Sequence, residues 1–212
     1  MKAIYRILVL LPTIGLLLTS FTRGDKGPKP LKIGKTAPKQ ELAMAGVDGL
    51  SKSLNDCKGE NGLLVIFSCN SCPFVVGTDK FAGWEVQYND MAKIAAAGNI
   101  GTVLINSNEA KREGDDSLEA MKLRSTEKGY TMPYLVDKDS ELANAFGAKT
   151  TPHVYLFNKE MKLVYSGSID NSWDSKRTEE LAYLKSALEQ LTKGEKIAEN
   201  NTVPRGCSIK RK

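Results

Sequence analysis

Cys69 and Cys72 are the residues whose type and spacing point most directly to chemistry. Only two residues separate them, and they directly follow an apolar run at residues 63–68, which predicts a strand buried on both faces, as in a parallel sheet. Pro73 and later apolar residues at spacings of three and four predict that a helix opens immediately afterwards. Cys69 should therefore lie near a helix N-terminus, where free N–H groups favour the thiolate, the nucleophilic form of cysteine.

We interpret this pair as a redox-active dithiol. Cys69 is assigned as the attacking thiol, with a pKa below the free value of ~8.5. Cys72 lies one helical turn further on and can resolve a mixed disulfide within the chain. The alternatives are a passive disulfide and a structural zinc site, but zinc usually needs four ligands. Besides this pair the sequence offers one histidine, His153, and two distant cysteines, Cys57 and Cys207. No metal or other cofactor is predicted.

Strands and helices that would position the pair alternate along the chain. We expect strands at residues 63–68, 101–106, 134–136, 154–157 and 163–165, and a hairpin or extended pair around Asp48-Gly49. We expect helices at residues 73–97, from Asp115 or Asp116 to before Gly129, from Ser140 to Gly147, and from about Leu181 to Gly194. This order predicts an α/β fold with a central mixed sheet and helices on both faces.

Three short motifs carry a resemblance to a known family. They are the string FSCNSCP at residues 67–73, the pair Thr151-Pro152, and GCSIK at residues 206–210. Together they resemble the redoxin branch of the thioredoxin-like proteins, which is grouped with the AhpC/TSA peroxidases, over roughly residues 31–212. The resemblance implies a thioredoxin-like fold and a cis peptide bond before Pro152. It also implies that Thr151 and Pro152 bind an extended substrate beside the dithiol.

The chain departs from the thioredoxin pattern in two ways. Leu63 stands six residues before Cys69, where many thioredoxins carry a buried acid, and no proline lies between the two cysteines. The direction of electron flow is therefore not indicated. Cys57 is expected to be a buried, unreactive thiol, and His153 a packed, hydrogen-bonded side chain rather than a base or ligand.

Of three candidate functions, a thiol–disulfide oxidoreductase acting on protein or small-molecule thiols and disulfides is favoured. A thiol peroxidase of the AhpC/TSA type is one alternative, but those relatives place Thr or Ser three residues before the reactive cysteine. Cys69 and Cys72 have Ile66 and Cys69 at that position. A copper-binding thioredoxin-like chaperone is the other alternative, since soft thiolates suit Cu(I). Those chaperones, however, separate their cysteines by three residues.

The first 24 residues resemble a signal peptide. Lys2 and Arg6 precede an apolar stretch at residues 7–18, which is shorter than the ~20 residues needed to span a bilayer. An uncleaved N-terminal anchor is the alternative for residues 1–24. We therefore expect export to the periplasm or the extracellular space, and membrane contact only if the segment is uncleaved.

The rest of the chain divides into a basic linker at residues 25–33, a thioredoxin-like redoxin domain at residues 34–194 and a C-terminal tail at residues 195–212. The net charge of +5 comes from the ends, because residues 40–204 hold 18 basic and 24 acidic residues. A nucleic-acid-binding domain carries a basic patch on its folded face. No nucleic-acid partner is predicted.

Cys207 lies on the C-terminal tail, thirteen residues beyond Gly194. An extended stretch of that length is long enough to reach the active-site edge of a domain of this size. Apolar Val203 and Ile209, and the resemblance of the terminal GCSIK motif, favour a docked tail with Cys207 as an accessory third thiol. A disulfide to Cys57, or a free or intermolecular thiol, remain the alternatives.

Overall fold

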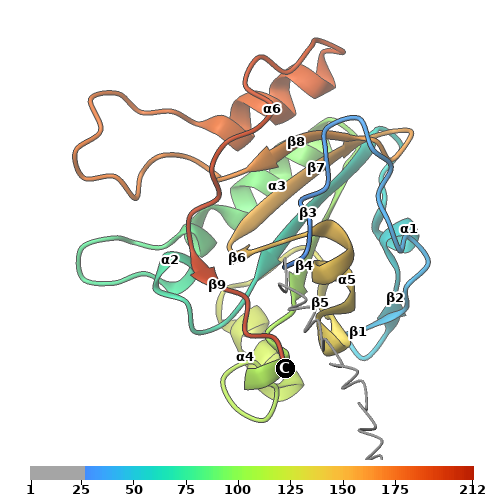
Figure 1. Cartoon of the computed structure of the whole chain (residues 1–212), viewed down its shortest axis with the longest axis vertical. Coiled ribbons are helices and arrows are strands. Elements are labelled where there is room, and N and C mark those ends of the chain that lie inside the picture. The colour runs from blue at the N-terminus through green and yellow to red at the C-terminus, as the bar shows by residue number, and fades with distance from the viewer. Residues whose placement is uncertain (1–26) are drawn as a thin grey trace, which may run out of the picture.

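The computed structural model describes residues 27–212. Seven strands form one mixed sheet in the order β2-β1-β5-β4-β3-β7-β8 (Figure 1). Their bounds are β1 Met44–Gly46, β2 Ser51–Lys52, β3 Gly62–Ser68, β4 Ile100–Asn106, β5 Tyr134–Val136, β7 His153–Asn158 and β8 Leu163–Gly167. β3 and β4, and β4 and β5, pair in parallel, whereas β7 pairs antiparallel with β3 and β8. The predicted α/β class with a mixed sheet is confirmed.

Helices of the described residues cover both faces of this sheet (Figure 1). Their bounds are α1 Leu54–Cys57, α2 Pro73–Val76, α3 Tyr88–Ala97, α4 Leu118–Glu127, α5 Glu141–Phe146 and α6 Tyr183–Thr192. The hairpins predicted around Asp48-Gly49 and between residues 157 and 163 are present as β1–β2 and β7–β8.

Strand β3 separates two apolar layers, because successive side chains of a strand point to opposite faces. Leu63, Val65 and Phe67 pack with α1 and α5 on one face. Leu64 and Ile66 pack with α3 and α6 on the other face. All seven residues of β3 are buried. The continuous apolar run before the cysteines therefore reflects a strand that is covered on both sides.

The single helix predicted at residues 73–97 is wrong, because the segment folds as α2, a loop, a 3-10 helix at Trp84–Gln87 and then α3. Gly77 and Gly83 adopt φ angles of 94° and 78°. Glycine accepts this region without the steric cost that other residues pay. The chain folds back instead of continuing a helix, and the rings of Phe74 in α2 and Trp84 in the 3-10 helix stack at 6.0 Å.

One of the predicted helix starts is also wrong: Ser117, rather than Asp115 or Asp116, is the N-cap of α4. Ser140 is the N-cap of α5, as predicted, but its side chain makes no capping hydrogen bond. The buried carboxylate of Asp137 accepts the first N–H groups of α5 instead. The carboxylate of Asp116 is thereby left free for contacts elsewhere.

A separate two-stranded sheet joins the C-terminal tail to the domain. β6 (Thr150–Thr151) pairs antiparallel with β9 (Cys207–Ser208), and Thr151 lies opposite Cys207. In Figure 1 the red tail leaves α6 and crosses to β6. Ile209 is buried, and its N–H donates to the carbonyl of Lys149. The tail is therefore docked, as the first of the three alternatives predicted.

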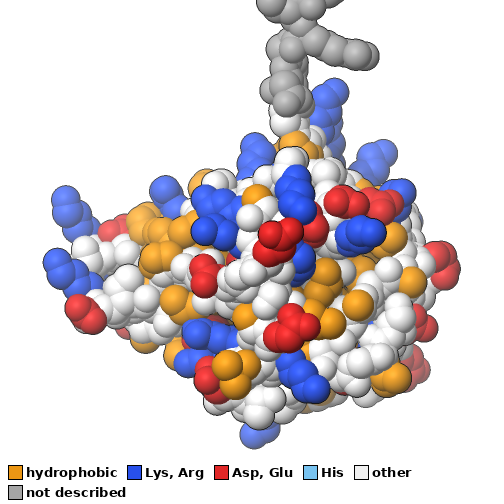
Figure 2. All heavy atoms as spheres, turned by 90° about the horizontal axis from the view of Figure 1, so that it is seen from below, with side chains coloured by type: hydrophobic (Ala, Val, Ile, Leu, Met, Phe, Trp, Pro, Cys, Tyr) orange, Lys and Arg blue, Asp and Glu red, His pale blue; other side chains and the backbone are white. Residues whose placement is uncertain are grey.

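Figure 2 shows one face of the molecule, on which Lys and Arg side chains lie among acidic and apolar ones rather than in one basic patch. Within residues 27–212, no helix combines the length and the apolar character needed to cross a membrane. The predicted signal peptide or anchor at residues 1–24 lies outside the described residues, so export stays a prediction.

Candidate active site

The C-x-x-C motif occupies the turn between β3 and α2. β3 ends at Ser68, which pairs with Asn106 at the end of β4. Cys72 is the N-cap of α2, and its carbonyl accepts the N–H groups of Val75 and Val76. Cys69 and Cys72 are only 2% and 3% exposed. The dithiol therefore lies beneath the surface, at the carboxyl end of the two central strands.

Thr151 faces both sulfurs. The Sγ of Cys69 lies 3.1 Å from the Oγ1 of Thr151, and the protonated Cys72 thiol donates to the Thr151 carbonyl at 3.1 Å. The peptide bond between Thr151 and Pro152 is cis, as predicted. The dithiol and the Thr-Pro loop thus form one site, although 82 residues separate Cys69 from Thr151 along the chain.

The tail closes this site from the other side. The backbone N–H of Cys207 donates to the Sγ of Cys72 at 3.3 Å. Gly206 passes so close to Thr151 that an added Cβ would lie 2.2 Å from the Thr151 carbonyl oxygen. Cys207 itself is neither fully buried nor fully exposed. It is therefore the outermost of three thiols gathered at one place.

The pKa directions of the three thiols follow from these contacts. The pKa of Cys72 falls to about 5, because the thiols of Cys69 and Cys207 and the N–H groups of Cys207 and Phe74 donate to its sulfur and outweigh burial. The pKa of Cys69 is raised, because its thiol donates to Cys72 and is buried. The pKa of Cys207 rises to about 11, through burial and its hydrogen bond to Cys72.

The lowered pKa predicted for Cys69 is therefore wrong in this structure. The main physical reason is that the Cys69 thiol donates a hydrogen bond to the Cys72 sulfur, which favours the thiolate of Cys72 over that of Cys69. The N–H of Phe74 at the start of α2 adds a smaller contribution to the same sulfur. The docked tail adds another donor to the same sulfur. Which of the two thiols attacks a substrate stays a prediction.

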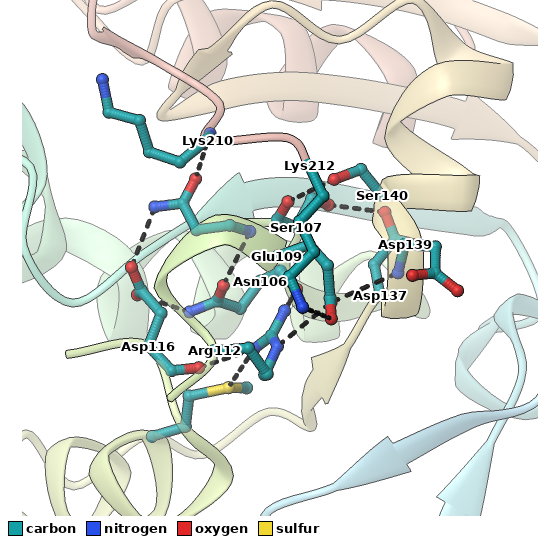
Figure 3. Close-up of polar contacts among 12 residues, drawn as sticks. Asn106, Ser107, Glu109, Arg112, Asp116, Asp137, Asp139, Ser140, Lys210 and Lys212 are labelled. Atoms are coloured by element: carbon teal, nitrogen blue, oxygen red, sulfur yellow. Dashed lines mark hydrogen bonds and ion pairs between the residues drawn. The ribbon is translucent and has the colours of Figure 1, made fainter. Parts of the chain in front are cut away.

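A buried polar cluster supports the C-x-x-C turn (Figure 3). Asp116 accepts hydrogen bonds from the backbone N–H of Asn70 at 2.8 Å and from the side-chain amides of Asn106 and Asn108 at 2.7 and 3.0 Å. The side-chain oxygen of Asn108 accepts the backbone N–H of Lys210 at 2.9 Å. One cluster therefore contacts both the turn between the cysteines and the C-terminal tail.

Sequence reasoning does not identify Asp116 as part of the site. It places Asp115 or Asp116 at the start of a helix, and Ser117 takes that role. The guanidinium of Arg112 donates to the backbone carbonyls of Asn106 and Asp116, at 2.9 and 2.6 Å, and holds the segment closed (Figure 3). An Arg a few residues before the acids was the available signal.

His153 is a packed side chain, as predicted. It is 5% exposed, its Nδ1 accepts the N–H of Lys149 at 3.3 Å, and its Nε2 lies 3.3 Å from the hydroxyl of Ser166. Burial lowers its pKa to about 3. Within residues 27–212, no group of three or more His, Cys, Asp or Glu side chains is arranged to hold a metal ion.

Cys57 lies at the opposite end of the sheet. It ends α1, and its carbonyl lies against Gly101 near the start of β4, whereas the dithiol follows the carboxyl end of β3. The seven residues of β3 span roughly 23 Å at about 3.3 Å per residue. A disulfide needs its Cα atoms within about 7 Å. The alternative that Cys57 pairs with Cys207 is therefore wrong.

A buried C-x-x-C that faces a cis Thr-Pro bond, in a mixed sheet covered by helices, defines a thioredoxin-like protein. The model of the Redoxin family matches residues 32–183, and the chain belongs to that family. No curated protein matches the chain.

Solved structures agree with this fold. An uncharacterized conserved protein from Geobacillus kaustophilus is 33% identical, with a TM-score of 0.76 over 87% of this chain and 95% of that one. A hypothetical protein from Sinorhizobium meliloti is 27% identical, with a TM-score of 0.72 over 87% of this chain and 97% of that one. A peroxidoxin from Mycobacterium tuberculosis is 14% identical, with a TM-score of 0.53 over 77% of this chain and 95% of that one, and shares the fold alone.

Proposed function

We propose that this protein is an exported thiol–disulfide oxidoreductase whose Cys69–Cys72 pair exchanges with protein or small-molecule thiols and disulfides. The observation that carries the proposal is the contact of both sulfurs with Thr151 of the cis Thr-Pro loop, each at 3.1 Å. Two cysteines that touch each other and a backbone edge can pass a disulfide between themselves and a bound chain.

The exchange balances as follows. A thiolate of the pair attacks a partner disulfide, forms a mixed disulfide and releases one partner thiolate, which takes up a proton. The second cysteine then attacks the mixed disulfide, so that the Cys69–Cys72 bond forms and the second partner thiolate leaves. The pair is oxidised by two electrons and the partner disulfide is reduced by two; the reverse sequence oxidises a partner dithiol.

The lowered pKa of Cys72 supports this chemistry, because a thiolate is available at neutral pH and is also a good leaving group. The Thr151 hydroxyl on Cys69 offers a further polar contact to the sulfur that is not ionised. The sequence assignment of Cys69 as the attacking residue is kept as part of the proposal: the Cys72 thiolate takes the proton of the Cys69 thiol as Cys69 attacks, passes it to the partner thiolate that leaves, and then resolves the mixed disulfide.

The test is reduction of insulin disulfides by the purified protein with dithiothreitol as electron source. We expect turnover by the wild type, and a loss of at least about a thousandfold in Cys69→Ser and Cys72→Ser, since either change removes the dithiol. Cys57→Ala is the matched control and should turn over at the wild-type rate. Equal rates in all four proteins would refute the proposal.

A thiol peroxidase is not favoured by any observation at the site. The residue three positions before Cys69 is Ile66, an apolar side chain buried in β3. The hydrogen-bond partners of the two sulfurs, within the part of the chain that the structure describes, include no arginine. Consumption of hydrogen peroxide by the reduced protein, measured beside insulin reduction, separates the two activities.

The proposal of export is supported by the signal-like pattern at residues 1–24. N-terminal sequencing of natively expressed protein tests it. We expect a mature chain starting between about Phe21 and Lys26; an intact Met1 in a cytosolic fraction would refute export.

A further inference from the structure

The docked tail places a third thiol against the dithiol. The N–H of Cys207 donates to the Sγ of Cys72 at 3.3 Å, and the side chain of Cys207 packs against the apolar cluster that includes Cys69 and Cys72. We propose that Cys207 is a third redox-active residue, which forms a disulfide with Cys72 and transfers electrons between the buried dithiol and external thiols. The proposal rests on the exchange chemistry proposed above for Cys69 and Cys72.

The different exposure of the three sulfur-bearing residues gives Cys207 a role that the other two cannot take. Cys69 and Cys72 are 2% and 3% exposed, so an external thiol does not reach them while the tail is docked. Cys207 is partly exposed. Because thiol–disulfide exchange requires direct access to a sulfur atom, the docked protein can exchange with its surroundings through Cys207.

The position of Cys207 is fixed on both sides. Before it, the guanidinium of Arg205 lies 4.4 Å from the ring centroid of Trp173. After it, the N–H of Ile209 donates to the carbonyl of Lys149, and the side chain of Ile209 is buried. The strand pairing of β9 with β6 lies between these anchors. Several independent contacts, rather than a single one, hold Cys207 against the dithiol.

The polar cluster extends this anchoring to the C-x-x-C turn. Asp116 accepts the N–H of Asn70, which lies between the two cysteines, and also binds the amide of Asn108. The side-chain oxygen of Asn108 accepts the backbone N–H of Lys210. Figure 3 shows Asp116 and Lys210 in this cluster. A second contact holds the same tail residue, because the N–H of Ala110 donates to the carbonyl of Lys210. The same buried carboxylate thus positions both the turn and the tail, so that Cys72 and Cys207 are held beside each other.

The transfer conserves atoms and electrons. Reduction of a partner by the dithiol, with the tail displaced from the site, leaves a Cys69–Cys72 disulfide, and the tail then docks again. The Cys207 thiolate attacks the Sγ of Cys72, the Cys72–Cys207 bond forms, and the Cys69–Cys72 bond breaks. Its electron pair stays on Cys69, which takes up the proton that Cys207 released. This step is an isomerisation with no net oxidation, and it moves the disulfide from a buried pair to a pair with an accessible sulfur.

An external dithiol then completes the cycle. Its thiolate attacks the Sγ of Cys207, the Cys72–Cys207 bond breaks, and Cys72 leaves as a thiolate. The second thiol of the external dithiol attacks the new mixed disulfide and releases Cys207, while the external dithiol becomes a disulfide. Exchange is faster when the leaving thiol has a low pKa, which is the situation of Cys72 beside its donors.

Disulfide mapping tests the bond directly. Reduced Cys57→Ala protein, with and without Cys69→Ser, is equilibrated with glutathione mixtures of graded redox poise, quenched with acid, alkylated and digested. We expect a Cys72–Cys207 peptide as the main product in the Cys69→Ser background, and a mixture with Cys69–Cys72 at intermediate poise when Cys69 is present. A Cys207 that is fully alkylated at every poise in both proteins would overturn the proposal.

Reduction kinetics test the transfer with two variants. One removes the Cys207 sulfur but keeps the tail docked, and the other keeps the sulfur but displaces the tail. Cys207→Ser keeps the backbone N–H and the covering strand but removes the third sulfur, so we expect dithiothreitol to reduce its disulfide about tenfold more slowly than that of the wild type. Gly206→Ala keeps Cys207, but its Cβ would collide with Thr151 and displace the tail. It should lose the Cys72–Cys207 peptide without slowing reduction, because its dithiol is uncovered.

These measurements separate the proposal from the one on which it rests. If wild-type protein fails to reduce insulin disulfides, the proposed activity is wrong. Disulfide mapping does not depend on that assay, so the presence or absence of the Cys72–Cys207 peptide still decides whether the bond forms. If insulin is reduced but Cys207→Ser is reduced by dithiothreitol as fast as the wild type, only the role of Cys207 is wrong. Should Cys69→Ser fail to fold, the poise series with Cys69 in place decides the result.

Discussion

Cys57 and Cys72 are two thiols at opposite ends of the central sheet, and burial acts on both of them in the same direction. The pKa of Cys57 rises to about 11, with burial as the main cause. The pKa of Cys72 falls to about 5 in spite of burial. The difference lies in the donors: Cys69, Cys207 and the start of α2 all direct hydrogen bonds at the Cys72 sulfur, whereas burial of Cys57 is not offset by such donors.

The comparison shows that position relative to the sheet decides which cysteine has a lowered pKa. The carboxyl ends of β3 and β4 lead into turns whose polar groups converge, and β6 and the tail add their backbones there. At the amino end of β4, Cys57 ends α1 and its carbonyl lies against Gly101, and among the residues that the structure describes no donors converge on its sulfur there. Four predictions test this contrast, in order of decreasing effect.

Removing the Cys72 sulfur should have the largest effect. In Cys57→Ala, the ultraviolet absorbance of a thiolate should appear with a midpoint near pH 5 and should be complete at pH 7. In Cys72→Ala the absorbance should be missing at pH 7, because the remaining thiols have raised pKa values. The opposite result would contradict the structure. If the thiolate absorbance persisted in Cys72→Ala and was lost in Cys69→Ala, Cys69 would be the thiol with the lowered pKa.

Asp116→Ala should lower the free energy of unfolding by about 3 kcal/mol or more. The change leaves three buried donors without their acceptor, and each lost hydrogen bond of this kind costs about 1–3 kcal/mol. Asp115→Ala is the matched control: its side chain is exposed, and the expected change lies within about 0.5 kcal/mol. Urea unfolding of the reduced proteins measures both changes. If Asp116→Ala lowered the free energy of unfolding by less than about 1 kcal/mol, the cluster would not be what stabilises the site.

The stability of the reduced protein should rise between about pH 6.5 and 8.5. The pKa of Cys72 is about 5 in the folded state, against 9.0 for an unperturbed thiol, so the unfolded chain binds one more proton in this range. Stability then increases by up to about 1.4 kcal/mol per pH unit. His153 does not contribute, because it is neutral in both states above its ordinary pKa of 6.5. Denaturant unfolding should show this slope in Cys57→Ala and lack it in Cys72→Ala.

Arg205→Ala should have the smallest effect. It removes the cation–π contact with Trp173, which contributes about 0.5–1 kcal/mol at a partly exposed position. The tail should then open more often, by roughly two- to fivefold, with faster hydrogen exchange at the amide of Cys207 and no change at the amides of β3. Unchanged exchange at Cys207 would show that β9 is held without Arg205.

The sequence predicted those parts of the fold that depend on local pattern. The continuous apolar run of β3 indicated a strand covered on both faces, and its side chains do alternate between two layers. The family motif around Thr151-Pro152 indicated the cis bond and its place beside the dithiol, because that loop depends on few residues.

The site's electrostatics could not be predicted in the same way, because they depend on where helices begin and on contacts across the chain. Trp84 and Tyr88 have helical spacing and follow Pro73, which predicts one helix. Gly77 and Gly83, however, turn the chain between Pro73 and Trp84. α2 begins at Pro73, as predicted, but the hydrogen bond from the Cys69 thiol to the Cys72 sulfur is what lowers the pKa of Cys72 most. The role of Asp116 depends on Asn70, which lies 46 residues away along the chain.

The pairing of β9 with β6 also sets the order in which the site is assembled. Synthesis delivers a chain from its N-terminus, and folding commonly begins in the parts that emerge first. Every element that positions the dithiol, from β3 to β8, precedes residues 207 and 208, which form β9. The nascent protein therefore passes through a stage in which β6 lacks its partner strand and the Sγ of Cys72 lacks the N–H of Cys207, and residues 207 and 208 complete the site once they are made.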